Sequence, residues 1–213
     1  MKIEKVNNLW VPSDDIHIEQ WKTGQPFTQN KCLNSFIEWC KSQHKTFRTV
    51  LDIGAWCGTW SLAMAEYSKK IHSFEPDKTH FTCLTRNVSQ YVHIDPKMIA
   101  LGDNNKETVA LSADNFTQSK RVIGEGSIQL HTVDEFSFEE VDLIKIDVEG
   151  FEMKVLKGAE NTLKQCQFLM IELNNNSKKY QSSNIEIENY LNDFGFRTLI
   201  NIWPDKVFVN KRI

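Results

Sequence analysis

The sequence predicts an α/β fold whose mostly parallel, seven-stranded sheet carries helices on both faces and closes with an antiparallel hairpin. From residue 49 onward, short apolar runs of strand length alternate with longer segments of helical periodicity, which is typical of βα units. The first run leads through a turn containing Gly54 and Gly58 into a helix, as in Rossmann-like folds. The chain is therefore interpreted as a Rossmann-like domain.

Five apolar runs have the length and the β-branched or aromatic content of buried strands. Helices are expected between and after them, because each segment repeats apolar residues at helical spacing. The predicted strands are residues 49–53, 71–74, 92–101, 141–148 and 168–173, and the predicted helices are residues 61–67, 78–88, 152–166 and 184–194.

The ends of the chain and one internal segment depart from this alternation. Residues 197–202 and 206–209, separated by Pro204 and Asp205, predict the closing hairpin. Residues 104–132 form a polar insertion, with weak strands expected at 108–111 and 127–131. We expect residues 1–48 to be an N-terminal extension or cap with one helix at residues 31–41, and residues 49–213 to be the main domain.

Composition narrows the class of protein. With 40% hydrophobic and 25% charged residues, the 213-residue chain can bury the core of one globular domain. Twenty-five Lys and Arg against 28 Asp and Glu leave a net charge of −3, so no basic surface for nucleic acid is expected. We find neither a membrane span nor a signal peptide, and a cytoplasmic location is expected. The five scattered cysteines are interpreted as buried thiols, without disulfide or zinc.

The turn VLDIGAWCGTWS has glycines at G-x-x-x-G spacing instead of the G-x-G-x-x-G that a dinucleotide requires. S-adenosylmethionine carries an α-ammonium group and a sulfonium but no phosphate, so a carboxylate at the strand end, Asp52, suits it. Gly54 would let the backbone approach this cofactor, and Gly58 would let the helix begin close to it. Ala55 is assigned to the same site. An ordinary glycine turn is the alternative interpretation.

Glu75 ends the second predicted strand, 21 residues after Gly54 (75 − 54). Rossmann-like folds place a ribose-binding acid about 20 residues after the first glycine. Glu75 is therefore predicted to accept hydrogen bonds from the ribose, and Pro76 is assigned to the same cofactor site. The alternative is that Glu75 is an acid at a helix N-terminus.

Two acidic residues, Asp147 and Glu149, follow the fourth predicted strand in VDLIKIDVEGFE. Ligands of open α/β sheets bind beyond the carboxyl ends of the strands, so both should line the same cleft as Asp52 and Glu75. A helix N-cap is the alternative role for one of them.

Taken together, the segments VLDIGAWCGTWS, FEPD, ALGD, LIKIDVEGFEMKVLKGAENTL and MIEL resemble the FkbM family of methyltransferases over residues 49–196. The resemblance implies a class I methyltransferase fold, S-adenosyl-L-methionine as the donor and a hydroxyl acceptor, often on a sugar or polyketide. It also implies that Asp52, Gly54 and Gly58 hold the methionine end, that Asp103 or its neighbours hold the adenine, and that Asp147 and Glu149 lie beside the transferred methyl. WVPSDDIHIEQW is similar to the leader of phage-type members.

A hydroxyl acceptor must lose a proton, and Asp147, Glu149 or Glu172 is the predicted general base. His17 and His72 are rival bases, although His72 is interpreted as structural because it lies inside a strand.

The acceptor is expected to be a small molecule or glycan, contacted by His17, Trp21 and Asn174. No metal ligand is assigned, but a Mg²⁺-assisted reaction stays open because Asp147, Glu172 and Asn174 follow neighbouring strands. Two other classes also stay open, a nicotinamide-dependent oxidoreductase and a non-catalytic module that binds S-adenosylmethionine. The sequence leaves the oligomeric state open.

Overall fold

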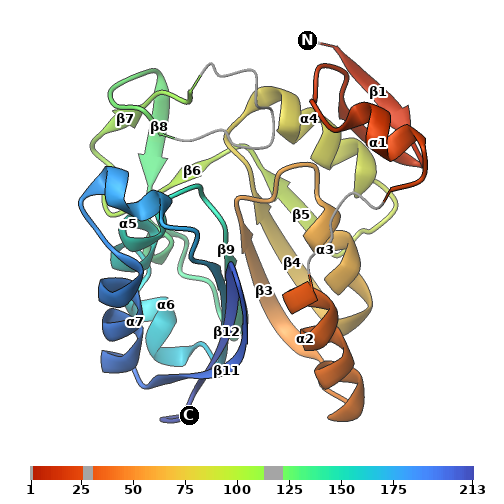
Figure 1. Ribbon diagram of the computed structural model, residues 1–213. Coiled ribbons are helices and arrows are strands. Elements are labelled where there is room, and N and C mark those ends of the chain that lie inside the picture. Colours follow the sequence, from red (N-terminus) through yellow and green to blue (C-terminus); the bar gives the residue numbers. More distant parts are fainter. Residues whose placement is uncertain (1, 26–30, 113–121) are drawn as a thin grey trace.

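A computed structural model of the chain describes residues 2–25, 31–112 and 122–213 (Figure 1). Within them, the main sheet has the strand order β11-β12-β10-β9-β3-β4-β5. Neighbouring strands run parallel, except that β12 is antiparallel to both β10 and β11. The predicted α/β fold with a closing antiparallel hairpin is confirmed. The strands are β3 (Phe47–Ile53), β4 (Ser68–Phe74), β5 (Ile94–Lys97), β9 (Val141–Ile146), β10 (Phe168–Glu172), β11 (Phe196–Ile202) and β12 (Asp205–Asn210).

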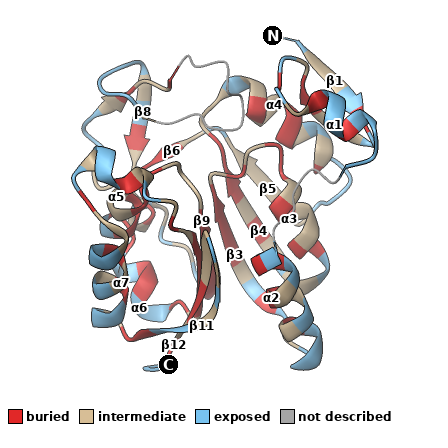
Figure 2. Ribbon diagram, viewed as in Figure 1, coloured by how far each residue is buried: buried red, intermediate tan, exposed pale blue. Residues whose placement is uncertain are grey.

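Helices cover both faces of this sheet because alternate residues of its buried strands point to opposite sides. Leu143 of β9 packs in the core on one side and Ile144 in the core on the other. Figure 2 shows the resulting pattern, with buried strands at the centre and exposed outer faces on helices such as α7. One face is covered by α2 (Lys31–Ser42), α3 (Thr59–Met64) and α4 (Lys78–Asn87), and the other by α5 (Glu152–Lys157), α6 (Glu160–Gln165) and α7 (Asn184–Asp193).

The helix α2 is part of the main core, although the sequence places it in an N-terminal extension. Phe36 of α2 is fully buried, and its ring stacks on Phe47 of β3 at 6.0 Å and on Trp39 at 5.8 Å. It also lies 6.1 Å from the ring of Phe168 on β10. The predicted boundary after residue 48 falls inside β3.

Residues 2–25 form a small N-terminal unit, where the sequence predicts no regular structure. Strands β1 (Ile3–Val6) and β2 (Leu9–Pro12) pair as an antiparallel hairpin, and α1 (Ile18–Lys22) follows. Asn87 of α4 joins this unit to the turn after β3. Its Oδ1 accepts from the Trp10 N–H at 2.7 Å, and its Nδ2 donates to the carbonyls of Trp10 (2.9 Å) and Cys57 (2.8 Å).

The single strand predicted at residues 92–101 is wrong, because the chain divides there into two strands of different sheets. Pro96 lies in β5 at the edge of the main sheet, where its missing N–H leaves no ladder bond unmade. After a turn at Ile99, the chain enters a second sheet of order β6-β8-β7. This sheet confirms the two weak strands of the insertion; residues 113–121 lie outside the described residues. Its strands are β6 (Ala100–Leu101), β7 (Thr108–Val109) and β8 (Ile128–His131).

The helix predicted at residues 152–166 is interrupted between α5 and α6. Gly158 lies against Gly102 there, and a Cβ at position 158 would stand 1.9 Å from the Gly102 carbonyl oxygen. The close approach of these two backbones explains the break. The helical periodicity of residues 152–166 gives no sign of it. Short 3₁₀ helices lie at Ala65–Tyr67, Asp134–Phe136 and Asn176–Tyr180.

All five cysteines are free and buried, as expected from their scatter. Burial raises the pKa of the Cys40 thiol to about 11 and that of Cys32 to about 12, so both stay protonated. In the part of the chain that the structure describes, no helix has both the length and the apolar character required to cross a membrane.

Replacing Phe36 by Ala tests whether α2 belongs to the core. We expect the free energy of unfolding to fall by about 3–5 kcal/mol, because a large cavity would open between α2, β3 and β10. Chemical denaturation measures this loss. Ile185→Ala is the control, since Ile185 is 72% exposed, and it should change stability by less than about 0.5 kcal/mol. Equal, small effects of both variants would contradict the packing described here.

Candidate functional site

A cavity of about 300 Å³ lies at the carboxyl ends of the parallel strands, where open α/β sheets bind their ligands. The turn after β3 and the start of the segment after β4 form one part of its wall, and the ends of β9 and β10 form another. The sequence-predicted residues that line it are Gly54, Ala55, Glu75, Pro76, Asp147, Glu149 and Glu172.

Gly54 is required by the packing of two strand ends. Its φ is +78°, and a Cβ at this position would lie 1.8 Å from the backbone carbonyl oxygen of Asp147. Only a residue without a side chain lets the turn after β3 come this close to the end of β9. Gly58 begins α3 against Leu84 of α4 and does not line the cavity.

Lys145 is a buried lysine of β9 that lines the cavity and that sequence reasoning missed. Its Nζ donates to the Gly54 carbonyl at 2.6 Å and lies 3.2 Å from Asp52 Oδ1 and 3.7 Å from Asp147 Oδ2. Burial lowers the pKa of Lys145, but the charges of Asp52 and Asp147 raise it by more, so its pKa lies above the ordinary value. Lys145 therefore stays charged. A lysine within the apolar run VDLIKIDV was the available signal.

Asp52 lies beneath the cavity and does not line it. Its carboxylate is fully buried, and Oδ2 accepts from Ser61 Oγ at 2.5 Å while Oδ1 faces Lys145. The predicted direct contact of Asp52 with a cofactor does not fit this position. Asp52 acts on the site through Lys145, which connects it to the Gly54 carbonyl.

Glu75 lines the cavity with both carboxylate oxygens fixed by backbone groups. Oε2 accepts from the Trp56 N–H at 2.9 Å, and Oε1 accepts from the Asp77 N–H at 2.8 Å. The side chain is almost fully buried, and the His80 ring lies 3.7 Å away. Asp77, and not Glu75, caps α4, by accepting from the N–H groups of Thr79 and His80. The alternative helix-terminal role therefore belongs to Asp77.

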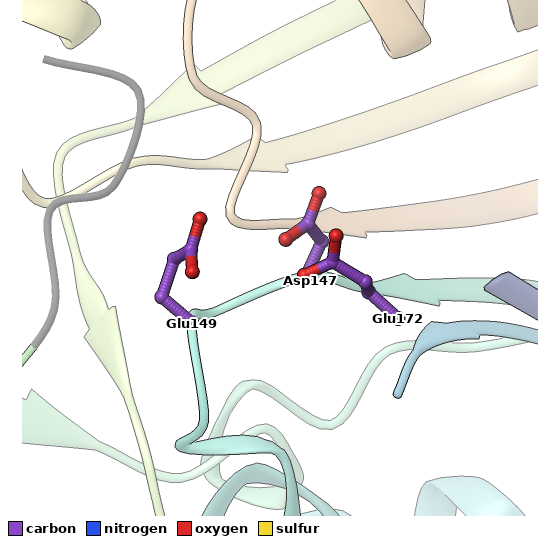
Figure 3. A group of neighbouring side chains, drawn as sticks. All are labelled: Asp147, Glu149 and Glu172. Carbon is purple, nitrogen blue, oxygen red and sulfur yellow. The ribbon is translucent and has the colours of Figure 1, made fainter. Parts of the chain in front are cut away.

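Asp147, Glu149 and Glu172 gather at the ends of β9 and β10, with oxygen atoms that all lie within 4.8 Å of one another (Figure 3). Glu149 has a φ of +57°, a strained conformation for a residue other than glycine, and accepts from Asn176 Nδ2 at 2.9 Å. Three carboxylates at this spacing could hold a hard divalent cation such as Mg²⁺. The set differs from the predicted one, because Asn174 donates to Glu172 Oε2 at 2.6 Å and does not line the cavity.

Glu172 differs from its two neighbours in protonation. Burial, followed by the charges of Asp147 and Glu149, raises the pKa of Glu172 to about 9. At neutral pH its side chain is therefore neutral. A protonated Glu172 can donate a hydrogen bond into the cavity but is a poor acceptor of a proton.

Asp103, His17 and Trp21 do not line the cavity. Asp103 forms an ion pair with Lys154 at 2.6 Å. His17 Nδ1 lies 3.2 Å from Asp15, and Trp21 is buried 5.7 Å from the ring of Trp56. Because Trp21 packs inside the N-terminal unit, a direct contact with an acceptor does not fit its position.

His72, the rival base, lies inside β4 with its Nδ1 3.0 Å from Asp95. Burial lowers the pKa of His72, and the residue does not line the cavity. Its structural interpretation agrees with this position.

Comparison with known proteins agrees with this fold and cavity. A methyltransferase from Clostridium acetobutylicum that depends on S-adenosylmethionine superimposes with a TM-score of 0.54, at 10% identity over 91% of this chain and 96% of the other. The N-methyltransferase NodS from Bradyrhizobium japonicum, in complex with S-adenosyl-L-homocysteine, gives 0.53, at 9% identity over 90% and 91%. The fold is that of the class I methyltransferases that depend on S-adenosylmethionine.

The family follows from the sequence match. The model of the methyltransferase FkbM domain matches residues 44–198, so this chain belongs to the FkbM methyltransferase family. The hexuronic acid methyltransferase AglP of Haloferax volcanii is 29% identical over an alignment of 133 residues, and the match covers 57% of this chain and 54% of AglP. The chain thus spans about half the length of this curated relative.

Replacing Lys145 by Met tests the buried charge group. We expect the free energy of unfolding to fall by about 3–5 kcal/mol, because Asp52 would keep a buried charge without its cation. Lys206→Met removes a matched lysine whose partner, Glu188, is partly exposed, and should cost less than about 1 kcal/mol. The double variant Lys145→Met, Asp52→Asn should recover part of the loss. Equal costs for the two lysines would contradict this role.

The pH dependence of stability tests the neutral Glu172. Its folded pKa of about 9 exceeds the ordinary 4.5, so its stabilising contribution is complete below about pH 4.5 and is lost as the pH rises toward 9. Glu172→Gln keeps a neutral group, so its melting temperature should rise relative to the wild type between about pH 5 and pH 9. Thermal melts at a series of pH values measure this difference. For the control Glu139→Gln, at an exposed site, the melting temperature should follow that of the wild type at every pH. If the melting temperature of Glu172→Gln also followed the wild type, the raised pKa of Glu172 would be disproved.

Proposed function

We propose that this chain transfers the methyl group of S-adenosylmethionine to a hydroxyl group of a sugar or glycan. The observation that carries the proposal is the cavity, which joins the Gly54 turn and Glu75 to a group of three carboxylates. The first part suits the cofactor and the second suits a polar acceptor. The relative AglP, described as a hexuronic acid methyltransferase, supports a sugar as the acceptor.

The residues present fit the cofactor. Glu75 presents a carboxylate already oriented by two N–H groups, which suits the vicinal hydroxyls of a ribose. Trp56 lines the cavity, and its buried Nε1–H has no hydrogen-bond partner among the described residues. Ala55 and Pro76 complete this wall.

Methyl transfer requires that the acceptor oxygen, the methyl carbon and the sulfur lie in one line, and that the acceptor hydroxyl loses its proton. When bound, S-adenosylmethionine supplies an electrophilic methyl group; the acceptor oxygen bonds to its carbon as the carbon–sulfur bond breaks, and S-adenosylhomocysteine leaves. Lys145 and Gly54 hold the end of β9 against the turn that contains Gly54. Asp147 follows directly at this end of β9 and lines the cavity there. We assign to Asp147 the role of the base that takes the hydroxyl proton, because its side chain is 39% exposed and Glu172 is already protonated.

The assignment predicts the effect of Asp147→Asn on turnover. With labelled S-adenosylmethionine and a panel of sugars, the wild type should transfer the label. Asp147→Asn should lower kcat by about 100- to 10,000-fold, since general base catalysis contributes about this much. Its affinity for S-adenosylhomocysteine should change little, which calorimetry checks. Asp193→Asn, at an exposed site of α7, is the matched control.

The proposed function and the role of Asp147 would be contradicted by different results. Transfer to no hydroxyl compound would overturn the proposed function, and full activity of Asp147→Asn would overturn the role of this residue. If EDTA abolished the activity and Mg²⁺ restored it, the proposed role of a free Asp147 carboxylate would be wrong. A cation held between Asp147, Glu149 and Glu172 would then take its place in the mechanism.

A further inference from the structure

Trp203 is an exposed tryptophan, with 77% of its surface in contact with solvent. We propose that its indole is a stacking platform for a second sugar unit of the acceptor, so that the preferred substrate is an oligosaccharide or glycoside and not a free monosaccharide. The inference rests on the proposed function and adds the size of the acceptor and a residue that selects it.

The position of Trp203 follows from the topology of the sheet. It lies in the turn between β11 and β12, and β12 runs antiparallel beside β10, with Asp205 directly opposite Glu172. The turn therefore stands at the carboxyl edge of the parallel strands, the edge that holds the cavity. Asp205 itself lines the cavity, and Trp203 comes two residues before it.

The turn is anchored at both sides of Trp203. The Leu173 N–H, next to Glu172, donates to the Pro204 carbonyl at 2.8 Å, and Ile202 pairs with Asp205 across the hairpin. Ile202 packs on the core beneath α2, whereas the Trp203 side chain remains in solvent. An aromatic side chain on an anchored turn loses little conformational freedom when a ligand covers it, which favours a binding role.

The separation of Trp203 from the carboxylates indicates which part of the acceptor it meets. Residues directly opposite on antiparallel strands lie about 5 Å apart, and two further residues of chain add at most about 7 Å. By these spacings the backbone of Trp203 lies within roughly 12 Å of Glu172, so an acceptor of two sugar units could reach both residues. In this arrangement one sugar unit presents its hydroxyl to Asp147, and the neighbouring unit stacks on Trp203.

The test compares Trp203→Ala, Trp203→Phe and the control Val92→Ala. Val92 is 95% exposed and precedes β5, at the amino edge of the sheet, away from the cavity. Methyl transfer is measured on disaccharides of glucose, N-acetylglucosamine and glucuronic acid and on the same monosaccharides. Trp203→Ala should raise KM for the preferred disaccharide at least tenfold, about 1.4 kcal/mol. The KM for S-adenosylmethionine, kcat and the monosaccharide KM should stay unchanged, and Trp203→Phe should restore most of the affinity.

Separate outcomes overturn the inference and the proposed function. If the wild type methylates sugars and Trp203→Ala has the KM of Val92→Ala, the platform is wrong and the proposed function stands. If the wild type methylates no sugar, the proposed function fails, and calorimetry of the disaccharides with protein saturated by S-adenosylhomocysteine decides on Trp203. Equal affinities of the wild type and Trp203→Ala, or no binding at all, overturn the platform. Dimerisation that Trp203→Ala abolishes would assign the indole to a second copy of the chain.

Discussion

The buried charge of Lys145 is the interaction on which the rest of the site depends. One ammonium group binds the Gly54 carbonyl and faces the carboxylates of Asp52 and Asp147, so it joins the ends of β3 and β9. Neither the buried Asp52 nor the buried lysine would be stable in this position alone, because an unpaired charge loses its hydration without compensation. The shape of the cofactor turn is thus fixed by electrostatics as well as by the missing side chain of Gly54.

Three of the carboxylates around the cavity differ in their surroundings and therefore in what they can do. Glu75 is held by two backbone N–H groups, whereas Glu172 lies among apolar residues and other acids and keeps its proton. Asp147 lies 3.7 Å from the Lys145 ammonium group, and its side chain is partly exposed to solvent. Residues of one chemical type can therefore orient a ligand, donate a hydrogen bond and accept a proton within the same site.

The sequence predicted those features that depend on local pattern. Apolar runs located the strands, and the spacing from Gly54 located Glu75, because both follow from the geometry of a βα unit. Partners distant in the chain decided the rest. Asp103 is paired with Lys154, and Trp21 packs against Trp56. Lys145 escaped notice because a single charge inside an apolar strand has no periodic signature, and only the folded sheet shows that Asp52 lies beside it.

The insertion of β12 between β10 and β11 has a consequence for biosynthesis. The ribosome makes β12 after every other strand of the main sheet, so β10 lacks its neighbour on that side until residues 205–210 have emerged. During this interval the apolar strand β10 presents an open edge, the kind of surface through which nascent chains associate. The edge closes when β12 enters, and the same event brings Asp205 opposite Glu172. Completion of the sheet and completion of the cavity wall therefore depend on the same strand.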